Sequence, residues 1–180
     1  QIRGLQTTPG REVQPVALAS YDAWIKYYRA DENSPNSSVS YYTKGAVIGF
    51  LLDMRIRAAT RGAKTLDDVM RLAYTRFSGE RGFTPEEFRA TTQEVAGADL
   101  SGWFRRALDT TEELDYTEAL DWLGLEFAGR PEDPEDQTDE PGWIGLVTRA
   151  GNGRLLVNQV RRGTPAHEAG FNVDDEILAI

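Results

Sequence analysis

The segment from Ser40 to Arg61 places the strongest constraint on how this chain can fold. Its apolar residues recur with the period of an α-helix, and Gly62 follows at the position of a C-terminal cap. A continuous helix over this segment would be about 33 Å long at the standard rise per residue. We therefore expect one long helix at the centre of a helical unit. The apolar residues that set the period are Val47, Phe50, Leu51, Met54 and Ala58.

Two glycines, Gly45 and Gly49, lie four residues apart and so share one face of this helix. Each should weaken the helix by roughly 1 kcal/mol relative to alanine. Two such costs on one face indicate that another backbone passes close by.

Shorter helices with clear start signals follow. Thr84-Pro85-Glu86-Glu87 is a capping box with proline at the first helical position. Paired acids at 67–68, 86–87 and 112–113 also fit helix starts, where the macrodipole favours negative charge. The expected helices are 66–77 after Thr65, 85–95 after Thr84, 100–108 after Asp99, and 115–123 before Gly124. The expected buried stripe of the third is Leu100, Trp103, Phe104 and Ala107.

The residues before the long helix are less regular. Residues 1–16 are rich in Gly, Thr, Pro and Gln and predict an extended leading segment. A helix capped by Ser20 should follow and end in the polar loop at 33–36. Its apolar stripe would consist of Tyr21, Trp24, Ile25 and Tyr28.

After Gly124 the character of the chain changes. Residues 123–127 form a possible strand, and 130–141 carry six acids and three prolines, which predicts a solvated loop. Segments 143–148 and 154–160 predict a hairpin around the turn at 150–153. A short helix at 163–170 and an apolar strand at 176–180 complete the chain.

Composition excludes several classes of function. The net charge is −9 without a basic stripe, so a nucleic-acid partner is not expected. There is no cysteine, which removes disulfides and thiolate sites, and the longest apolar stretch is too short for a transmembrane segment.

The chain contains one histidine, His167. Peptidase zinc sites usually need two imidazoles and a carboxylate, so these residues cannot form such a site by themselves. We interpret His167 as a surface residue and predict no metal site in this chain.

The sequence Tyr41-Tyr42-Thr43-Lys44-Gly45 opens the long helix. By residue type alone, two tyrosines at a helix start most simply pack there. A phenol with a pKa near 10 is also protonated at neutral pH and can donate a hydrogen bond to an oxyanion. The residues leave both interpretations open.

A family resemblance favours the second interpretation. Tyr-x-Lys-Gly leading into a long apolar helix resembles the gluzincin aminopeptidases, which are zinc enzymes with a thermolysin-like catalytic domain. The wider frame is similar to their glycyl aminopeptidase branch. The segments that carry the resemblance are Thr8 to Arg11, Ser20 to Trp24, Ser40 to Gly45, Phe83 to Phe88, and Gly97 to Phe104.

The resemblance implies a role for one residue here. In that family the tyrosine of the motif stabilises the tetrahedral intermediate, and this role falls on Tyr42. Tyr41 lies about 100° round the helix and is assigned to packing. Lys44 and Gly45 are given structural roles. The implied zinc belongs to the parent protein, with its ligands and general base outside this chain.

A second resemblance concerns the C-terminal part. The order from Gly142-Trp143-Ile144-Gly145 to Asp175-Glu176-Ile177-Leu178 resembles the front of a PDZ domain. That likeness implies a loop, Trp143, Ile144 and Gly145, whose backbone N–H groups meet the carboxylate of a peptide C-terminus. The second helix and final strand of a PDZ groove have no counterpart, so the module is expected to be incomplete and to expose apolar strand surface.

The overall prediction is a mainly α chain. Residues 1–124 would be the helical C-terminal part of a peptidase catalytic domain, 125–141 a strand and acidic linker, and 142–180 a PDZ-like module. The implied function is that of a zinc-dependent aminopeptidase acting on peptide substrates, and the fragment alone should be inactive. The alternative is a non-enzymatic helical scaffold carrying a PDZ-type peptide-binding module.

Overall fold

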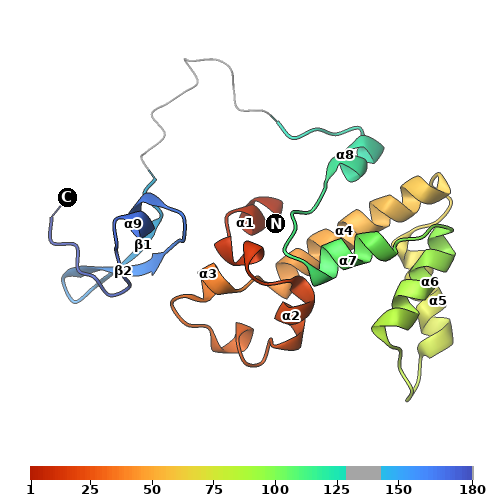
Figure 1. The fold of residues 1–180 in the computed structure, drawn as a ribbon, viewed down its shortest axis with the longest axis horizontal. Coiled ribbons are helices and arrows are strands. Elements are labelled where there is room, and N and C mark those ends of the chain that lie inside the picture. Colours follow the sequence, from red (N-terminus) through yellow and green to blue (C-terminus); the bar gives the residue numbers. More distant parts are fainter. Residues whose placement is uncertain (129–142, 180) are drawn as a thin grey trace.

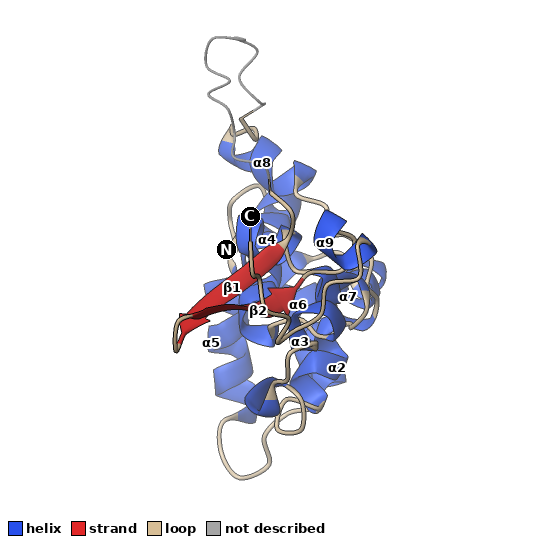
Figure 2. Cartoon of the chain, turned by 90° about the vertical axis from the view of Figure 1, so that its left-hand side faces the viewer, coloured by secondary structure: helices blue, strands red, loops and turns tan. Residues whose placement is uncertain are grey.

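The computed structural model describes residues 1–128 and 143–179. The chain is mainly α-helical, with one small antiparallel hairpin near its C-terminal end (Figures 1 and 2). None of the described helices is both long enough and apolar enough to span a bilayer. The helices before the hairpin are α1 (Ile2–Gln6), η1 (Pro9–Glu12), α2 (Val16–Tyr21), η2 (Tyr27–Arg29), α3 (Ser34–Ser37), α4 (Tyr41–Thr60), α5 (Leu66–Phe77), α6 (Pro85–Ala96), α7 (Ser101–Asp109) and α8 (Thr117–Leu123). The remaining elements are β1 (Leu146–Gly151), β2 (Arg154–Val160) and α9 (Pro165–Glu168).

Helix α4 is the predicted long helix, and the C-terminal cap expected at Gly62 is confirmed. Ser40 Oγ accepts from the Thr43 N–H at 3.2 Å, and Arg61 and Gly62 end the helix at positive φ. One face of α4 packs against α1, α2 and α8, and another packs against α5, α6 and α7 (Figure 1). The first core contains Leu5, Ala19, Val39, Val47, Leu51, Met54 and Ala119. The second contains Leu52, Ile56, Val69, Ala96, Leu100 and Phe104.

The indole of Trp103 joins these cores. It is partly buried and packs against both of them and against a third small core of Val16, Ile48 and Ala107. The predicted stripe of α7 is therefore confirmed. The period of α4 is wrong at Phe50, which is exposed, because α4 buries two faces and Phe50 lies on neither.

The paired glycines of α4 do not mark a close backbone approach, contrary to the prediction. No described residue comes within 4 Å of a Cβ built on Gly45 or Gly49. The close approach occurs elsewhere, at Gly10 of η1. A Cβ on Gly10 would lie 2.0 Å from the carbonyl oxygen of Ser38.

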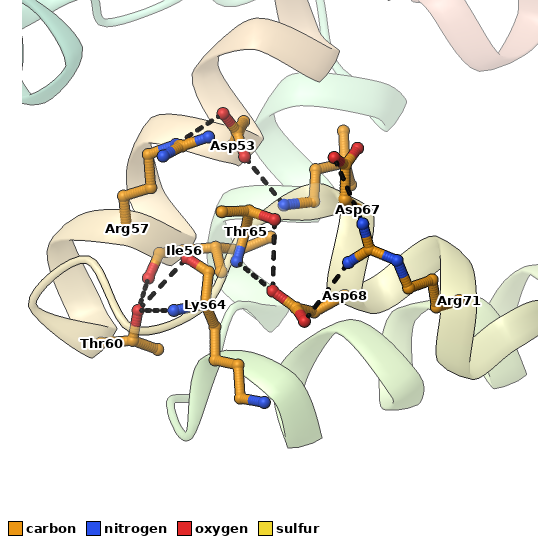
Figure 3. Close-up of polar contacts among 10 residues, drawn as sticks. Asp53, Ile56, Arg57, Thr60, Lys64, Thr65, Asp67, Asp68 and Arg71 are labelled. Atoms are coloured by element: carbon orange, nitrogen blue, oxygen red, sulfur yellow. Dashed lines mark hydrogen bonds and ion pairs between the residues drawn. The ribbon is translucent and has the colours of Figure 1, made fainter.

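The connection from α4 to α5 is held by side-chain caps (Figure 3). Asp53 accepts from Arg57 Nε and from the Leu66 N–H, each at 2.8 Å. The Thr65 N–H donates to Asp68 Oδ2 at 2.9 Å, so the predicted N-terminus of α5 is confirmed. At α6 the Glu87 N–H donates to Thr84 Oγ1, as the capping box predicts.

Other predictions for the helical part are wrong in identifiable ways. Residues 1–16 are not extended but form α1 and η1, because Leu5 is drawn into the core of α4. The helix expected to begin after Ser20 does not form, because the preceding helix α2 ends at Tyr21. Residues 123–127 contain no strand. The pair Glu112-Glu113 does not start a helix; Glu113 instead forms an ion pair with Arg11.

The C-terminal part is a hairpin closed by α9 (Figure 2). The turn at Asn152 and Gly153 has positive φ at both residues and joins β1 to β2, as the turn signal predicts. The segment around Glu176 bonds to the other edge of β2, with Ile177 N donating to Leu155 O at 2.8 Å. A strand was expected at 176–180; within the described residues 176–179, this single bridge stands in its place. The linker 130–141 lies outside the described residues.

Removing the α6 cap should weaken the helical unit. We expect Thr84→Ala to lower the free energy of unfolding by about 1 kcal/mol, because the Glu87 N–H loses its acceptor. Urea denaturation followed by circular dichroism measures this. Thr75→Ala, an exposed change inside α5, is the control and should be neutral or slightly stabilising. Equal losses in both variants would contradict the cap assignment.

Glycine substitutions should separate open from crowded positions. We expect Gly49→Ala to stabilise the chain by up to about 1 kcal/mol, since helix propensity improves and no described atom is displaced. Gly10→Ala should instead cost about 2 kcal/mol or more, because its Cβ would overlap the Ser38 carbonyl. Thermal unfolding of the two variants tests the pair; a loss of stability in Gly49→Ala would show that its face is not open.

Candidate active site

The candidate site is a group of aromatic side chains at the N-terminus of α4. Tyr42 lies in the first turn of α4, and its side chain is 57% exposed. Tyr27 and Tyr28 come from η2, fifteen and fourteen residues before Tyr42 in the chain. We call Tyr27, Tyr28, Tyr41 and Tyr42 the tyrosine cluster. The chain reversal between η2 and α4 brings the four rings together.

Three hydroxyls of the cluster are joined by hydrogen bonds. Tyr28 Oη lies 2.9 Å from Tyr42 Oη and 3.0 Å from Tyr41 Oη. Tyr27 packs beside all three rings, with centroid distances of 5.3 to 5.9 Å. This role of Tyr28 is not predicted by the sequence, in which Tyr28 falls on the apolar stripe of an expected helix that does not form. Only the tyrosine-rich composition around 27–28 and 41–42 hinted at it.

Tyr41 has a double position. Its side chain is partly buried and packs against the cores around α4, which agrees with the packing role predicted for it. Its ring nevertheless stacks on that of Tyr42 at 4.2 Å, and both hydroxyls reach Tyr28. The expectation that the two neighbours face apart is therefore wrong. Two long side chains at a helix start can converge on a partner that another segment supplies.

The hydrogen bonds shift the pKa values of Tyr41 and Tyr42 in opposite directions. The hydrogen bond with Tyr28 lowers the pKa of Tyr42, and the one with Tyr41 adds to the effect. The hydrogen bond to Tyr28 raises the pKa of Tyr41, with a further contribution from Tyr42. Tyr42 is thus the hydroxyl whose oxygen is best stabilised by its neighbours.

The loop that leads into Tyr41 and Tyr42 is fixed by buried polar groups. Gln14 Nε2 donates to the Asp22 carboxylate at 3.0 Å, and Gln14 Oε1 accepts from the Val39 N–H at 3.4 Å. All of these residues are buried. Together with the Gly10 contact to Ser38, this network ties η1, α2 and the start of α4 into one support.

Asn36 connects the same loop to the C-terminal hairpin. Its Nδ2 donates to the Val160 carbonyl and its Oδ1 accepts from the Arg162 N–H, each at 2.9 Å. The side chain is buried. Arg161 also donates to the Thr7 carbonyl at 3.1 Å. The hairpin is therefore docked against α3, in the segment between Tyr28 and Tyr41 of the tyrosine cluster (Figure 1).

Lys44, two residues after Tyr42, is 3% exposed. Burial lowers the pKa of its ammonium; the Glu113 carboxylate opposes this shift and the Arg11 guanidinium adds to it. Glu113 forms its own ion pair with Arg11, with an Nε to Oε1 distance of 2.9 Å that lacks good hydrogen-bond alignment. Lys44 is thus a buried cation, and the carboxylate that stabilises its charge, that of Glu113, is also paired with Arg11.

The residues present do not fit a zinc site. Within 1–128 and 143–179, no three His, Cys, Asp or Glu side chains are grouped as metal ligands. His167 is exposed on α9, in the C-terminal part of the chain. No chemical step through zinc is derived for these residues.

The predicted peptide-contacting loop, Trp143 to Gly145, leads into β1. Trp143 and Ile144 are exposed, while Gly145 has positive φ and is buried against Thr164. The Ile144 carbonyl accepts from the Ala166 N–H at 3.0 Å, which fixes the loop on α9. Apolar surface is exposed around it, as expected, at Val147, Phe171 and Leu178.

Comparison with known proteins relates this helical unit to the peptidases. The chain superimposes on the crystal structure of an aminopeptidase N family protein from Idiomarina loihiensis with a TM-score of 0.80 and 28% identity. The match covers 99% of this chain and 32% of that chain, so this chain spans about a third of that protein.

A family model indicates a narrower class of peptidase. Residues 1–48, which include the tyrosine cluster, match the model of the M61 glycyl aminopeptidases. No significant match is found among curated protein sequences. The two matches bear out the resemblance to the glycyl aminopeptidase family predicted from the sequence.

The burial of Lys44 leads to a pH-dependent prediction. We expect Lys44→Met to raise the free energy of unfolding at pH 7 by roughly 1 kcal/mol, because it removes a desolvated charge and leaves Glu113 paired with Arg11. The advantage should shrink as the pH rises towards about 10.4, since wild-type Lys44 loses its proton earlier in the folded state than in the unfolded state.

Chemical denaturation at pH 7 and pH 9.5 measures both effects. Lys64→Met, at an exposed lysine, is the matched control and should show neither the gain nor the pH dependence. A loss of stability in Lys44→Met would mean that the ammonium is stabilised more by its neighbours than it is destabilised by burial.

Proposed function

We propose that this chain is the helical part of an aminopeptidase and supplies the tyrosine that stabilises the oxyanion, Tyr42. The observation that carries the proposal is the exposed hydroxyl of Tyr42 at the N-terminus of α4, within the region that matches the glycyl aminopeptidases. Had that hydroxyl been enclosed by the core, it could not reach a substrate.

The chemistry required of Tyr42 is that of a hydrogen-bond donor. When a peptide carbonyl becomes tetrahedral, its oxygen gains negative charge, and a donor aimed at that oxygen lowers the barrier. A phenol is suited to this because it keeps its proton at neutral pH. Tyr42 is held in a fixed place by the Ser40 cap, the stacked Tyr41 ring and the Tyr28 hydroxyl.

The zinc that such an enzyme uses would be bound by residues outside those described here. We also propose that residues 1–124 form the catalytic part and that 142–180 form a PDZ-like module. In that module the loop of Trp143, Ile144 and Gly145 is the candidate contact for the C-terminus of a peptide. Two observations support this assignment: the exposed side chains of Trp143 and Ile144, and the outer edge of β1, which pairs with no further strand among the described residues.

The test of the proposal is Tyr42→Phe in the full-length protein that contains this chain. We expect turnover of a peptide substrate to fall by about 10²–10³-fold with little change in KM, because the lost donor acts mainly in the transition state. Tyr74→Phe, at an exposed tyrosine of α5, is the control. Turnover of the Tyr42 variant close to wild type would refute the assignment and favour the helical-scaffold alternative.

A further inference from the structure

We propose that Tyr28 is a positioning residue for Tyr42, and that its hydroxyl leaves the Tyr42 proton free for the substrate oxygen. This inference rests on the proposed function. Its basis is the 2.9 Å contact between Tyr28 Oη and Tyr42 Oη, made by a residue of η2 that lies outside the Tyr-x-Lys-Gly motif.

Proton counting fixes the direction of these hydrogen bonds in the active state. Each hydroxyl has one proton to donate and can accept two hydrogen bonds. If Tyr42 donated to Tyr28, it would have no proton left for a substrate. The productive order is Tyr41 to Tyr28 to Tyr42, because each oxygen then accepts from the previous hydroxyl and the Tyr42 proton points away from the cluster.

A chain of this kind also strengthens its last donor. Successive hydrogen bonds polarise one another, so an O–H whose oxygen already accepts a hydrogen bond is a better donor. The acidity of the cluster agrees with this order: the pKa of Tyr42 is lowered, chiefly by Tyr28, and that of Tyr41 is raised.

The ring of Tyr28 is itself held in place. Trp24 packs on it with a centroid distance of 5.0 Å, and Tyr27 meets it edge-on at 5.3 Å. The Tyr28 N–H donates to the Ala23 carbonyl at 3.0 Å. The turn between α2 and α3 is therefore built to present the Tyr28 hydroxyl to the start of α4.

The first test measures acidity in the chain described here. Tyrosine labelled with ¹³C at Cζ would be followed by NMR across alkaline pH, with Tyr42 assigned by its loss in Tyr42→Phe. We expect Tyr28→Phe to raise the pKa of Tyr42 towards the ordinary value near 10. Tyr27→Phe, which keeps the ring packing, should leave it nearly unchanged. An unchanged Tyr42 pKa in a folded Tyr28→Phe variant would overturn the inference.

The second test uses turnover in the full-length protein. We expect Tyr28→Phe to lower kcat about three- to tenfold at constant KM, the range for one neutral hydrogen bond. The alkaline limb of the kcat profile should move to higher pH, because Tyr42 then keeps its proton longer. A purely structural role would lower the melting temperature without moving that limb.

The two proposals fail in different ways. If Tyr42→Phe leaves turnover intact, the proposed function is wrong. If Tyr42→Phe is impaired while Tyr28→Phe shows wild-type kcat and an unmoved alkaline limb, the function stands and the role of Tyr28 is refuted.

Discussion

The burial of two faces of one helix is the constraint on which the rest of this structure depends. Helix α4 is enclosed by α1, α2 and α8 on one side and by α5, α6 and α7 on the other, with Trp103 touching both cores. Each of the three cores described in residues 1–128 contains residues of α4, so α4 supplies the surface that the short helices share. The N-terminus of α4 is consequently held rigidly, and so is the backbone of its first residues.

The tyrosine cluster lies at this rigid start of α4. A hydrogen-bond donor contributes to a transition state when its position does not have to be reorganised during the reaction. Tyr42 combines an exposed hydroxyl with a neighbour on each side, one stacked on its ring and one bonded to its oxygen. An exposed side chain without contacts would be mobile. The stacked Tyr41 ring and the Tyr28 hydroxyl hold the Tyr42 side chain in one orientation.

Local signals in the sequence predicted much of the fold. The capping residues Thr65 and Thr84 located two helix starts, and Asn152-Gly153 located the hairpin turn. The errors concern features that depend on distant partners. Leu5 turned an apparently extended segment into a helix by entering a core, and Tyr28 joined Tyr42 through a reversal of the chain that no periodicity contains. The proposed role of Tyr42 depends on a motif, because its position in the helix alone does not distinguish donation from packing.

The joint between the helical unit and the hairpin is made by an amide that imitates a neighbouring strand. Asn36 offers one donor and one acceptor, and both meet main-chain atoms of 160 and 162. The Asn36 bonds do not depend on side-chain identity in the hairpin, whereas the Arg161 guanidinium, which donates to the Thr7 carbonyl, does. Other side chains of the hairpin can therefore change while its attachment to the helical unit is preserved, as long as Asn36 and Arg161 remain.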